Sequence, residues 1–180
     1  MIYKFALGLI TFLLATNTSS IPLGINLLSS LNPVFPAGIV GWALLILRVS
    51  TGGLFILHGY PKVTHLKQWA NSMHMPIFMC FLSAWSMFLG GFALIIGFLT
   101  LLATLPIFAS MVFAAFLEIT SGKPFVARDP YLIPEDQYKG PLGKGEPPSW
   151  EKAFMYCVML ITIAVLGPGA FSLDASIFGQ

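Results

Sequence analysis

The feature that most constrains the fold of this chain is a stretch of 42 consecutive residues, Pro76 to Leu117, without one charged side chain. A surface that faces water needs charged residues, and soluble domains contain about 25% of them. In the whole chain of 180 residues only 9% are charged, while 57% are hydrophobic. Most of the surface must therefore face lipid, which predicts an integral membrane protein.

The uncharged stretch is twice the length of one membrane-spanning helix. A helix crosses the hydrocarbon core with about 20 apolar residues, so we expect two helices joined by a turn near residues 97–100. Two further spans are predicted at 37–60 and at 150–166, the latter ending at a Gly-Pro-Gly sequence that a helix does not continue through. The expected fold is an all-α membrane protein, a four-helix transmembrane bundle.

The N-terminal region is predicted to be separate from this bundle. Lys4 precedes an apolar run, a pattern typical of a signal peptide or a signal-anchor helix. Residues 17–36 carry no charge and contain three prolines, which favours a stretch lying along the membrane surface. We therefore divide the chain into an anchor-like segment, 1–36, and a four-helix membrane domain, 37–180, to which the first segment adds a helix if it spans.

Lysine and arginine predict the orientation of the spans. The polar loops at 61–75 and 119–150 lie on the same side and contain six basic residues, whereas the segments on the opposite side contain none. Because basic loops stay in the cytoplasm, we expect a multi-pass protein of a prokaryotic-type inner (cytoplasmic) membrane with both loops cytoplasmic. The polar region 118–151 contains six prolines, and a loop of this length is either a partner-binding segment or an ordered coil.

Arg48 is the residue most costly to place in a membrane. It lies about a dozen residues from the cytoplasmic end of its span, or about 18 Å deep at about 1.5 Å per residue. Burying an arginine at that depth costs at least about 2.5 kcal/mol, so it should face the bundle interior. No carboxylate lies in the predicted spans at that depth. The Arg48 charge must therefore be compensated by one of four groups: backbone carbonyls, hydroxyls, a partner subunit, or a bound anion or quinone oxygen.

Further polar residues lie on the same helix as Arg48 or at the cytoplasmic ends of the spans. His58 lies on the flank of its helical stripe and Lys62 within it, at about 100° per residue. His58 could exchange protons near neutral pH, although both residues could equally sit at the headgroup level. Glu118 ends the third span on the side of Lys62. The candidates for a ligand or quinone site are therefore Arg48, His58, Lys62 and Glu118.

The sequence predicts no metal site and no cofactor of its own. Cys80 and Cys157 are far apart in the sequence, and no CxxC or other metal-ligand spacing occurs. They are either two buried thiols, which we favour, or a disulfide. The small net charge of +2 gives no reason to expect nucleic acid as a partner. The expected surroundings are a lipid bilayer and other membrane subunits.

Three motifs resemble the DoxX/DoxD-like membrane protein family. They are Leu-Arg-Val-Ser-Thr-Gly-Gly-Leu-Phe-Ile-Leu-His-Gly-Tyr-Pro-Lys at 47–62, Phe-Leu-Gly-Gly-Phe-Ala-Leu-Ile-Ile-Gly-Phe-Leu-Thr at 88–100 and Gly-Pro-Gly-Ala-Phe-Ser-Leu-Asp at 167–174. Two positions depart from the family pattern: Met87 stands where members often carry glutamate, and Leu101 where they often carry arginine. The absent glutamate would have been the expected partner of Arg48.

The resemblance implies a role in membrane redox chemistry. The DoxD branch resembles a subunit of thiosulfate:quinone oxidoreductase, which suggests a subunit of a quinone-linked electron-transfer complex, with sulfur-compound oxidation as one option and quinone as a substrate. Whether the chain is itself catalytic stays open. The alternative is a non-catalytic accessory subunit that stabilises a larger respiratory or photosynthetic complex. Small-solute transport has less support, because the sequence has no internal repeat.

Overall fold

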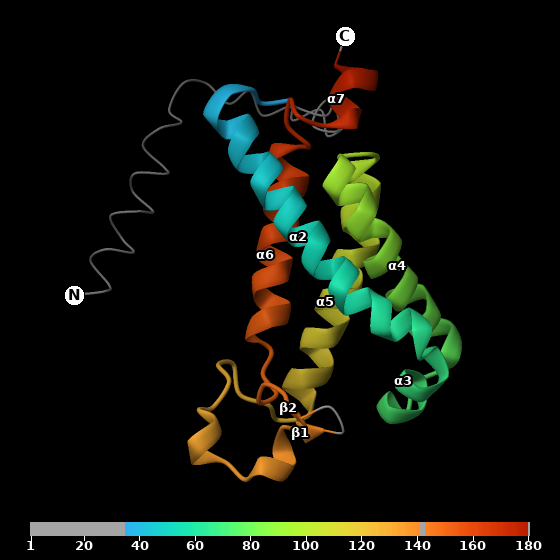
Figure 1. Cartoon of the computed structure of the whole chain (residues 1–180), viewed down its shortest axis with the longest axis vertical. Helices are drawn as coiled ribbons and strands as arrows, with labels where there is room; N and C mark the ends of the chain where they lie inside the picture. Colours follow the sequence, from blue (N-terminus) through green and yellow to red (C-terminus); the bar gives the residue numbers. More distant parts are fainter. Residues whose placement is uncertain (1–34, 141–142, 180) are drawn as a thin grey trace, which may run out of the picture. The chain divides into compact units, whose positions relative to one another are not determined.

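A computed structural model describes residues 35–140 and 143–179 of the chain. The predicted signal-anchor helix and nearly all of the predicted interfacial stretch, residues 1–34, lie outside the described residues. Within the described part, four long helices follow one another: α2 (Gly38–Thr64), α4 (Ile77–Ile96), α5 (Thr100–Thr120) and α6 (Glu151–Leu166). Successive long helices run in alternating directions (Figure 1).

Three of the described helices are long and apolar enough to cross a membrane: α2, α4 and α5. The prediction of a helical, multi-pass membrane protein is thereby confirmed. The turn between α4 and α5 also lies where the sequence predicts it, because Gly97 ends α4 in a left-handed conformation, with φ of 68°. The predicted helix at 150–166 is present as α6, whose 16 residues are fewer than the about 20 that a span ordinarily needs.

The prediction of a loop at 61–75 is wrong, since most of this segment is helical. Helix α2 continues through Pro61 to Thr64, and a short helix, α3, follows at Leu66–Met73. Pro61 removes one backbone donor but does not end the helix, because the next turn is closed by a hydrogen bond from His65 N to Pro61 O (3.0 Å). The polar residues of α3 are mostly exposed while Ala70 is buried, so polar composition here marks an amphipathic surface helix.

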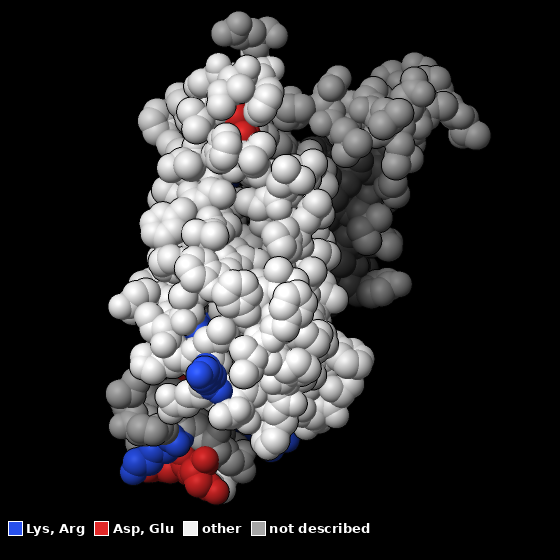
Figure 2. Space-filling model, turned by 90° about the vertical axis from the view of Figure 1, so that its right-hand side faces the viewer, with Lys and Arg blue, Asp and Glu red and all other residues white. Residues whose placement is uncertain are grey.

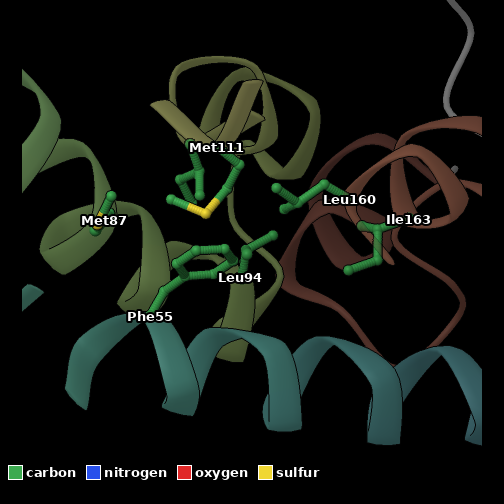
Figure 3. Packing of buried hydrophobic residues seen from close by; sticks show 7 residues of the cluster. Phe55, Met87, Leu94, Met111, Leu160 and Ile163 are labelled. Atoms are coloured by element: carbon green, nitrogen blue, oxygen red, sulfur yellow. The ribbon is translucent and has the colours of Figure 1, made fainter. Parts of the chain in front are cut away.

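The four long helices share one apolar core. It consists of side chains from each of them: Phe55, Met87, Leu94, Ile107, Met111, Leu160 and Ile163. Figure 3 shows Phe55 of α2 pointing between Met111 of α5 and Leu94 of α4, with Leu160 and Ile163 of α6 beside them. Many other large apolar side chains point outward and are exposed, as expected for helices surrounded by lipid.

Glycines bring α2 and α4 into close contact. A Cβ added to Gly52 would lie 2.5 Å from Gly91 O, and a Cβ added to Gly91 would lie 2.7 Å from Gly52 O. Neither position therefore admits a side chain without moving the helices apart. Gly90 faces α5 in the same way, because its Cβ would lie 2.7 Å from Ile107. These glycines therefore allow close helix packing.

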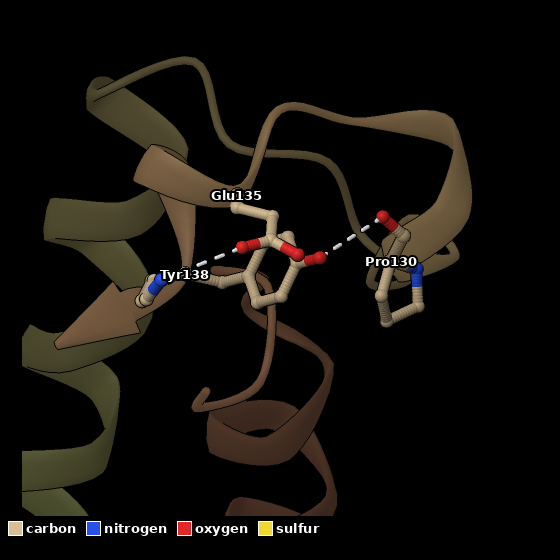
Figure 4. A network of polar contacts seen from close by, with 4 residues as sticks. Pro130, Glu135 and Tyr138 are labelled. Carbon is tan, nitrogen blue, oxygen red and sulfur yellow. Dashed lines mark hydrogen bonds and ion pairs between the residues drawn. The ribbon is translucent and has the colours of Figure 1, made fainter. Parts of the chain in front are cut away.

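The polar region between α5 and α6 is built from short elements. Two 3₁₀ turns, η2 (Pro130–Leu132) and η3 (Glu135–Gln137), precede the antiparallel strands β1 (Lys139–Gly140) and β2 (Gly143–Lys144). Tyr138 holds the turns together. Its hydroxyl donates to Pro130 O at 3.2 Å (Figure 4), and its backbone N–H donates to Glu135 O, also at 3.2 Å.

The two ends of the described part of the molecule differ in charge. Helix α3 and the strands β1 and β2 lie at one end, and helix α7 (Leu173–Phe178) lies at the other (Figure 1). On the face drawn in Figure 2, most charged side chains gather at the end of the strands, and the surface between the two ends is almost free of them. The helical surface thus has the pattern of an apolar band with a polar border.

Candidate functional site

Arg48 is completely buried and bonded to backbone carbonyls that are distant in sequence. Its Nη1 donates to Leu94 O at 3.1 Å, and its Nη2 donates to Phe171 O at 2.5 Å. Leu94 belongs to the last turn of α4, and Phe171 to the segment between α6 and α7. One side chain of α2 therefore joins both other chain segments, and we call this group the Arg48 junction: Arg48, Leu94, Gly97, Phe171 and Asp174.

Gly97 and Asp174 complete the junction. A Cβ on Gly97 would overlap Nη1 of Arg48, so only glycine leaves room for the guanidinium. The Asp174 carboxylate accepts hydrogen bonds from Leu99 N (2.7 Å) and Thr100 N (2.9 Å), and Asp174 N donates to Gly97 O (2.8 Å). Asp174 thus satisfies backbone donors at the start of α5. The negative charge of Asp174 also interacts favourably with the positive charge of Arg48.

Of the four groups that could meet the Arg48 charge, the structure places backbone carbonyls around it. Arg48 lies ten residues from the start of α2 and sixteen from its end, so its contacts lie toward the end of the molecule with α7. The Arg48 Nε is buried without a hydrogen-bond partner among the described residues. This nitrogen is the donor left for a ligand oxygen, and a ligand role for Arg48 stays a prediction.

His58 lies apart from the Arg48 junction and is paired with Tyr156. The His58 Nε2 and Tyr156 Oη atoms are 3.1 Å apart, which joins α2 to α6. The two rings meet edge to face, with centroids 5.9 Å apart, and the Phe55 ring packs on Tyr156 at 4.8 Å. His58 is exposed and Tyr156 half-buried. This His58–Tyr156 pair can exchange protons and is reachable from the helix surface.

Lys62 points toward α4 from the same helix as His58. Its Nζ donates to Met87 Sδ at 3.5 Å and lies 4.8 Å from the centroid of the Trp69 ring. A thioether is a weak acceptor and an aromatic face attracts a cation, so the charge is only partly compensated. Met87 is thus the neighbour of Lys62, and a glutamate there would be a partner for Lys62. The expectation that it would pair with Arg48 is wrong.

Glu118 does not lie against the other candidate site residues. It lies half-buried near the end of α5, and its backbone carbonyl accepts from Lys123 N at 3.0 Å. No hydrogen bond or ion pair joins its carboxylate to Arg48, His58 or Lys62. Cys80 and Cys157 are free thiols. In the described part of the chain, no group of three or more His, Cys, Asp or Glu side chains could hold a metal ion.

Two residues of these sites escaped the sequence reasoning. Tyr156 lies in the predicted span at 150–166, and nothing in its sequence position reveals that it faces His58. Asp174 follows the last predicted span, and its position alone does not reveal that it lies near Arg48. A signal for Asp174 did exist, because it is the last residue of the third family-like motif while Arg48 is the second residue of the first.

The comparisons with known proteins support the membrane family inferred from the motifs. The DoxX family model matches residues 43–118, which include most of α2, all of α3 and α4, and α5 up to Glu118. No curated protein and no solved structure matches the chain. The matched region contains Arg48, His58, Lys62 and Met87, whereas Tyr156 and Asp174 lie outside it. Over residues 43–118, this membrane protein is therefore similar to the DoxX family.

Proposed function

We propose that this chain is a subunit of a quinone-linked membrane redox complex and that the His58–Tyr156 pair contacts the quinone. The similarity to the DoxX family supports a redox-associated role in the membrane. The observation that carries the proposal is the 3.1 Å contact between His58 Nε2 and Tyr156 Oη on an accessible helix surface. Quinones dissolve in the lipid phase, so a site for them must open to it.

The chemistry of the pair suits a quinone oxygen. A quinone that takes up two electrons also takes up two protons, one at each oxygen, and becomes a quinol. Tyr156 can donate its hydroxyl proton to one quinone oxygen and regain a proton from His58, which is reprotonated from the polar end of the molecule. Water supplies the proton for the second oxygen. The Phe55 ring beside Tyr156 offers an apolar wall. The electrons come from a redox centre of a partner subunit or from a reduced sulfur compound.

Lys62 would supply positive charge one helical turn from His58. Residues four apart lie on the same helix face. Within the described part of the chain, the ammonium group has only a thioether and an aromatic ring as partners. A cation so placed favours the negative charge of a partly reduced quinone or of a sulfur oxyanion. Arg48 has a different part in this proposal, because carbonyls hold both of its terminal nitrogens; it fixes α2, α4 and the α6–α7 segment together.

The proposal includes the full topology in an inner membrane. Helix α6 is the fourth span of a four-helix bundle, which its contribution to the common core supports. At about 1.5 Å per residue its 16 residues cover about 24 Å, so the segment 167–172 must complete the crossing. The end with α3, β1 and β2 faces the cytoplasm, because it carries most of the lysines and arginines.

Quinone reduction by native membranes tests the proposed site. His58→Leu and Tyr156→Phe should each lower quinone reduction at least about tenfold when activity is normalised to assembled protein, because proton transfer typically contributes a factor of about 100 or more. His65→Leu is the matched control, since His65 is exposed at the end of α2 and its side chain bonds only to Thr64 among the described residues. Wild-type rates in both His58→Leu and Tyr156→Phe would contradict the proposed site.

The accessory-subunit function is favoured by a separate observation. An intramembrane arginine often marks a functional site, but the bonds of Arg48 to Leu94 and Phe171 explain it by the fold alone. Under this alternative, the two site variants keep full activity, while deletion of the whole chain lowers the amount of the assembled complex.

A further inference from the structure

A small cationic cavity lies where α5 leaves the membrane-spanning part of the chain. Its volume is about 160 Å³, and it is lined by Ser121 and Lys123 just after α5, by Arg128, and by Pro124, Pro147 and Pro148. Proline rings have a fixed backbone conformation, and Pro147 is buried. The parts of the wall formed by the prolines are therefore stiff.

The two basic residues of the cavity have no acidic partners in the described part of the chain. Lysines elsewhere in the same loop region are paired: Lys139 with Glu135 at 3.7 Å, and Lys152 with Glu146. Lys123 and Arg128, in contrast, form no ion pair with any described residue, and none of the residues that line the cavity is acidic. The cavity thus presents two uncompensated positive charges.

The C-terminal end of α5 has a weak unfavourable effect on an anion in the cavity. The carbonyls at a helix C-terminus carry the equivalent of about half a negative charge. One of them, Glu118 O, already accepts from Lys123 N (3.0 Å), and Ile119 O accepts from Gly122 N (3.0 Å). Two full positive charges exceed that partial charge, so the net field in the cavity attracts anions.

Aromatic side chains place the cavity at the membrane–water boundary. The rings of Phe125 and Trp150 lie 4.2 Å apart, and Phe154 packs against both at 5.7 and 6.4 Å. Backbone hydrogen bonds from Trp150 N to Pro124 O (3.4 Å) and from Glu151 N to Phe125 O (3.0 Å) fix this cluster to the cavity wall. Clusters that include tryptophan are enriched at the headgroup level.

We propose that this cavity binds a phosphate group at the headgroup level, held by Lys123 and Arg128. The guanidinium fork of Arg128 suits two phosphate oxygens, and the ammonium of Lys123 acts as a compact charge. Ser121 offers a hydroxyl donor. Two sources present this chemistry at that depth: the headgroup of an anionic phospholipid in the surrounding leaflet, and free phosphate from solution. The position beside the aromatic cluster favours the phospholipid.

Lipid retention by the full-length protein tests the site. The protein is placed in nanodiscs of phosphatidylcholine with a minor fraction of phosphatidylglycerol, released, and examined by native mass spectrometry for bound lipid. We expect selective retention of phosphatidylglycerol, reduced at least fivefold in the double variant Lys123→Gln/Arg128→Gln. The control Lys67→Gln/Lys139→Gln removes the same charge from the same end of the protein outside the cavity and should retain the lipid as the wild type does.

A second arm separates the two sources of phosphate. Added inorganic phosphate should compete with the lipid only weakly; binding of inorganic phosphate that depends on Lys123 and Arg128, without retention of phosphatidylglycerol, would support the site and assign free phosphate to it. Equal lipid retention in the two double variants, with no phosphate binding lost in the cavity variant, would overturn the proposal. Circular dichroism and thermal unfolding of each variant confirm that the fold is intact.

Discussion

Nη1 of Arg48 occupies the space that a side chain on Gly97 would need. The two residues come from α2 and from the turn after α4, and their contact requires an arginine in the one position and a glycine in the other. The same turn presents Leu99 N and Thr100 N to the Asp174 carboxylate. A buried charge, a tight turn and the chain after α6 are thus parts of one structure.

Gly97→Ala should strongly destabilise the protein. The alanine must adopt a left-handed conformation at φ of 68°, which costs about 1–2 kcal/mol, and its methyl group displaces the guanidinium. Thermal unfolding in detergent should show a clearly lower midpoint. Gly53→Ala is the control, because Gly53 lies inside α2 with nothing near its absent Cβ, and alanine there should stabilise by about 0.5–1 kcal/mol. Similar midpoints for the two variants would contradict the junction.

Arg48→Leu should lower the yield of folded protein, and Arg48→Lys should restore it in part. Leucine leaves the part-buried Phe171 O without its donor and leaves Leu94 O only the bond from Gly97 N (3.2 Å). An unsatisfied buried carbonyl costs about 1–3 kcal/mol. An ammonium group can reach one of the two carbonyls but cannot hold both with the geometry of the fork. Size-exclusion profiles and unfolding midpoints measure the order wild type, lysine, leucine. A leucine variant as stable as the wild type would exclude a structural role.

Met87→Glu should give Lys62 the carboxylate that it lacks. Met87 is almost fully buried, so an isolated glutamate there is unfavourable, but next to Lys62 Nζ it can form an ion pair. A double-mutant cycle on unfolding midpoints, with Lys62→Leu as the second change, should yield a favourable coupling of about 0.5–3 kcal/mol. A coupling of zero would show that Lys62 turns away from this position.

Labelling of introduced cysteines should establish the orientation. In a background without the native cysteines, Ser72→Cys and Ser121→Cys are expected to resist an impermeant thiol reagent outside intact cells, while Ser176→Cys reacts. All three serines are exposed, so protection reports the membrane side. The reverse pattern would place α3 and the polar loop outside.

The sequence predicted the helices well because hydropathy and helix breakers act locally. The uncharged run from Pro76 to Leu117 determines α4 and α5, and Gly97 determines the turn between them. The prediction was wrong at α3, because the polar composition of this surface helix is also typical of a loop. The partners of Arg48 were not predictable, because Leu94 and Phe171 are 46 and 123 residues away, and the contact depends on how three segments pack.

The same reason explains what was missed at the candidate redox site. The sequence indicates that His58 could exchange protons near neutral pH or could lie at the headgroup level. Tyr156 is 98 residues away, and only the packing of α6 on α2 brings its hydroxyl to the imidazole. Local sequence patterns therefore identify candidate chemical groups, and the tertiary structure determines which of these groups are in contact.

Photolabelling with a quinone analogue tests the central claim most directly. A photoreactive quinone is illuminated in native membranes, and the labelled peptides of this chain are identified by mass spectrometry. We predict labels on α2 near His58 and on α6 near Tyr156, suppressed by excess unmodified quinone and reduced in the Tyr156→Phe variant. Labels scattered along the lipid-exposed helices, unaffected by excess quinone, would contradict a quinone site at the His58–Tyr156 pair.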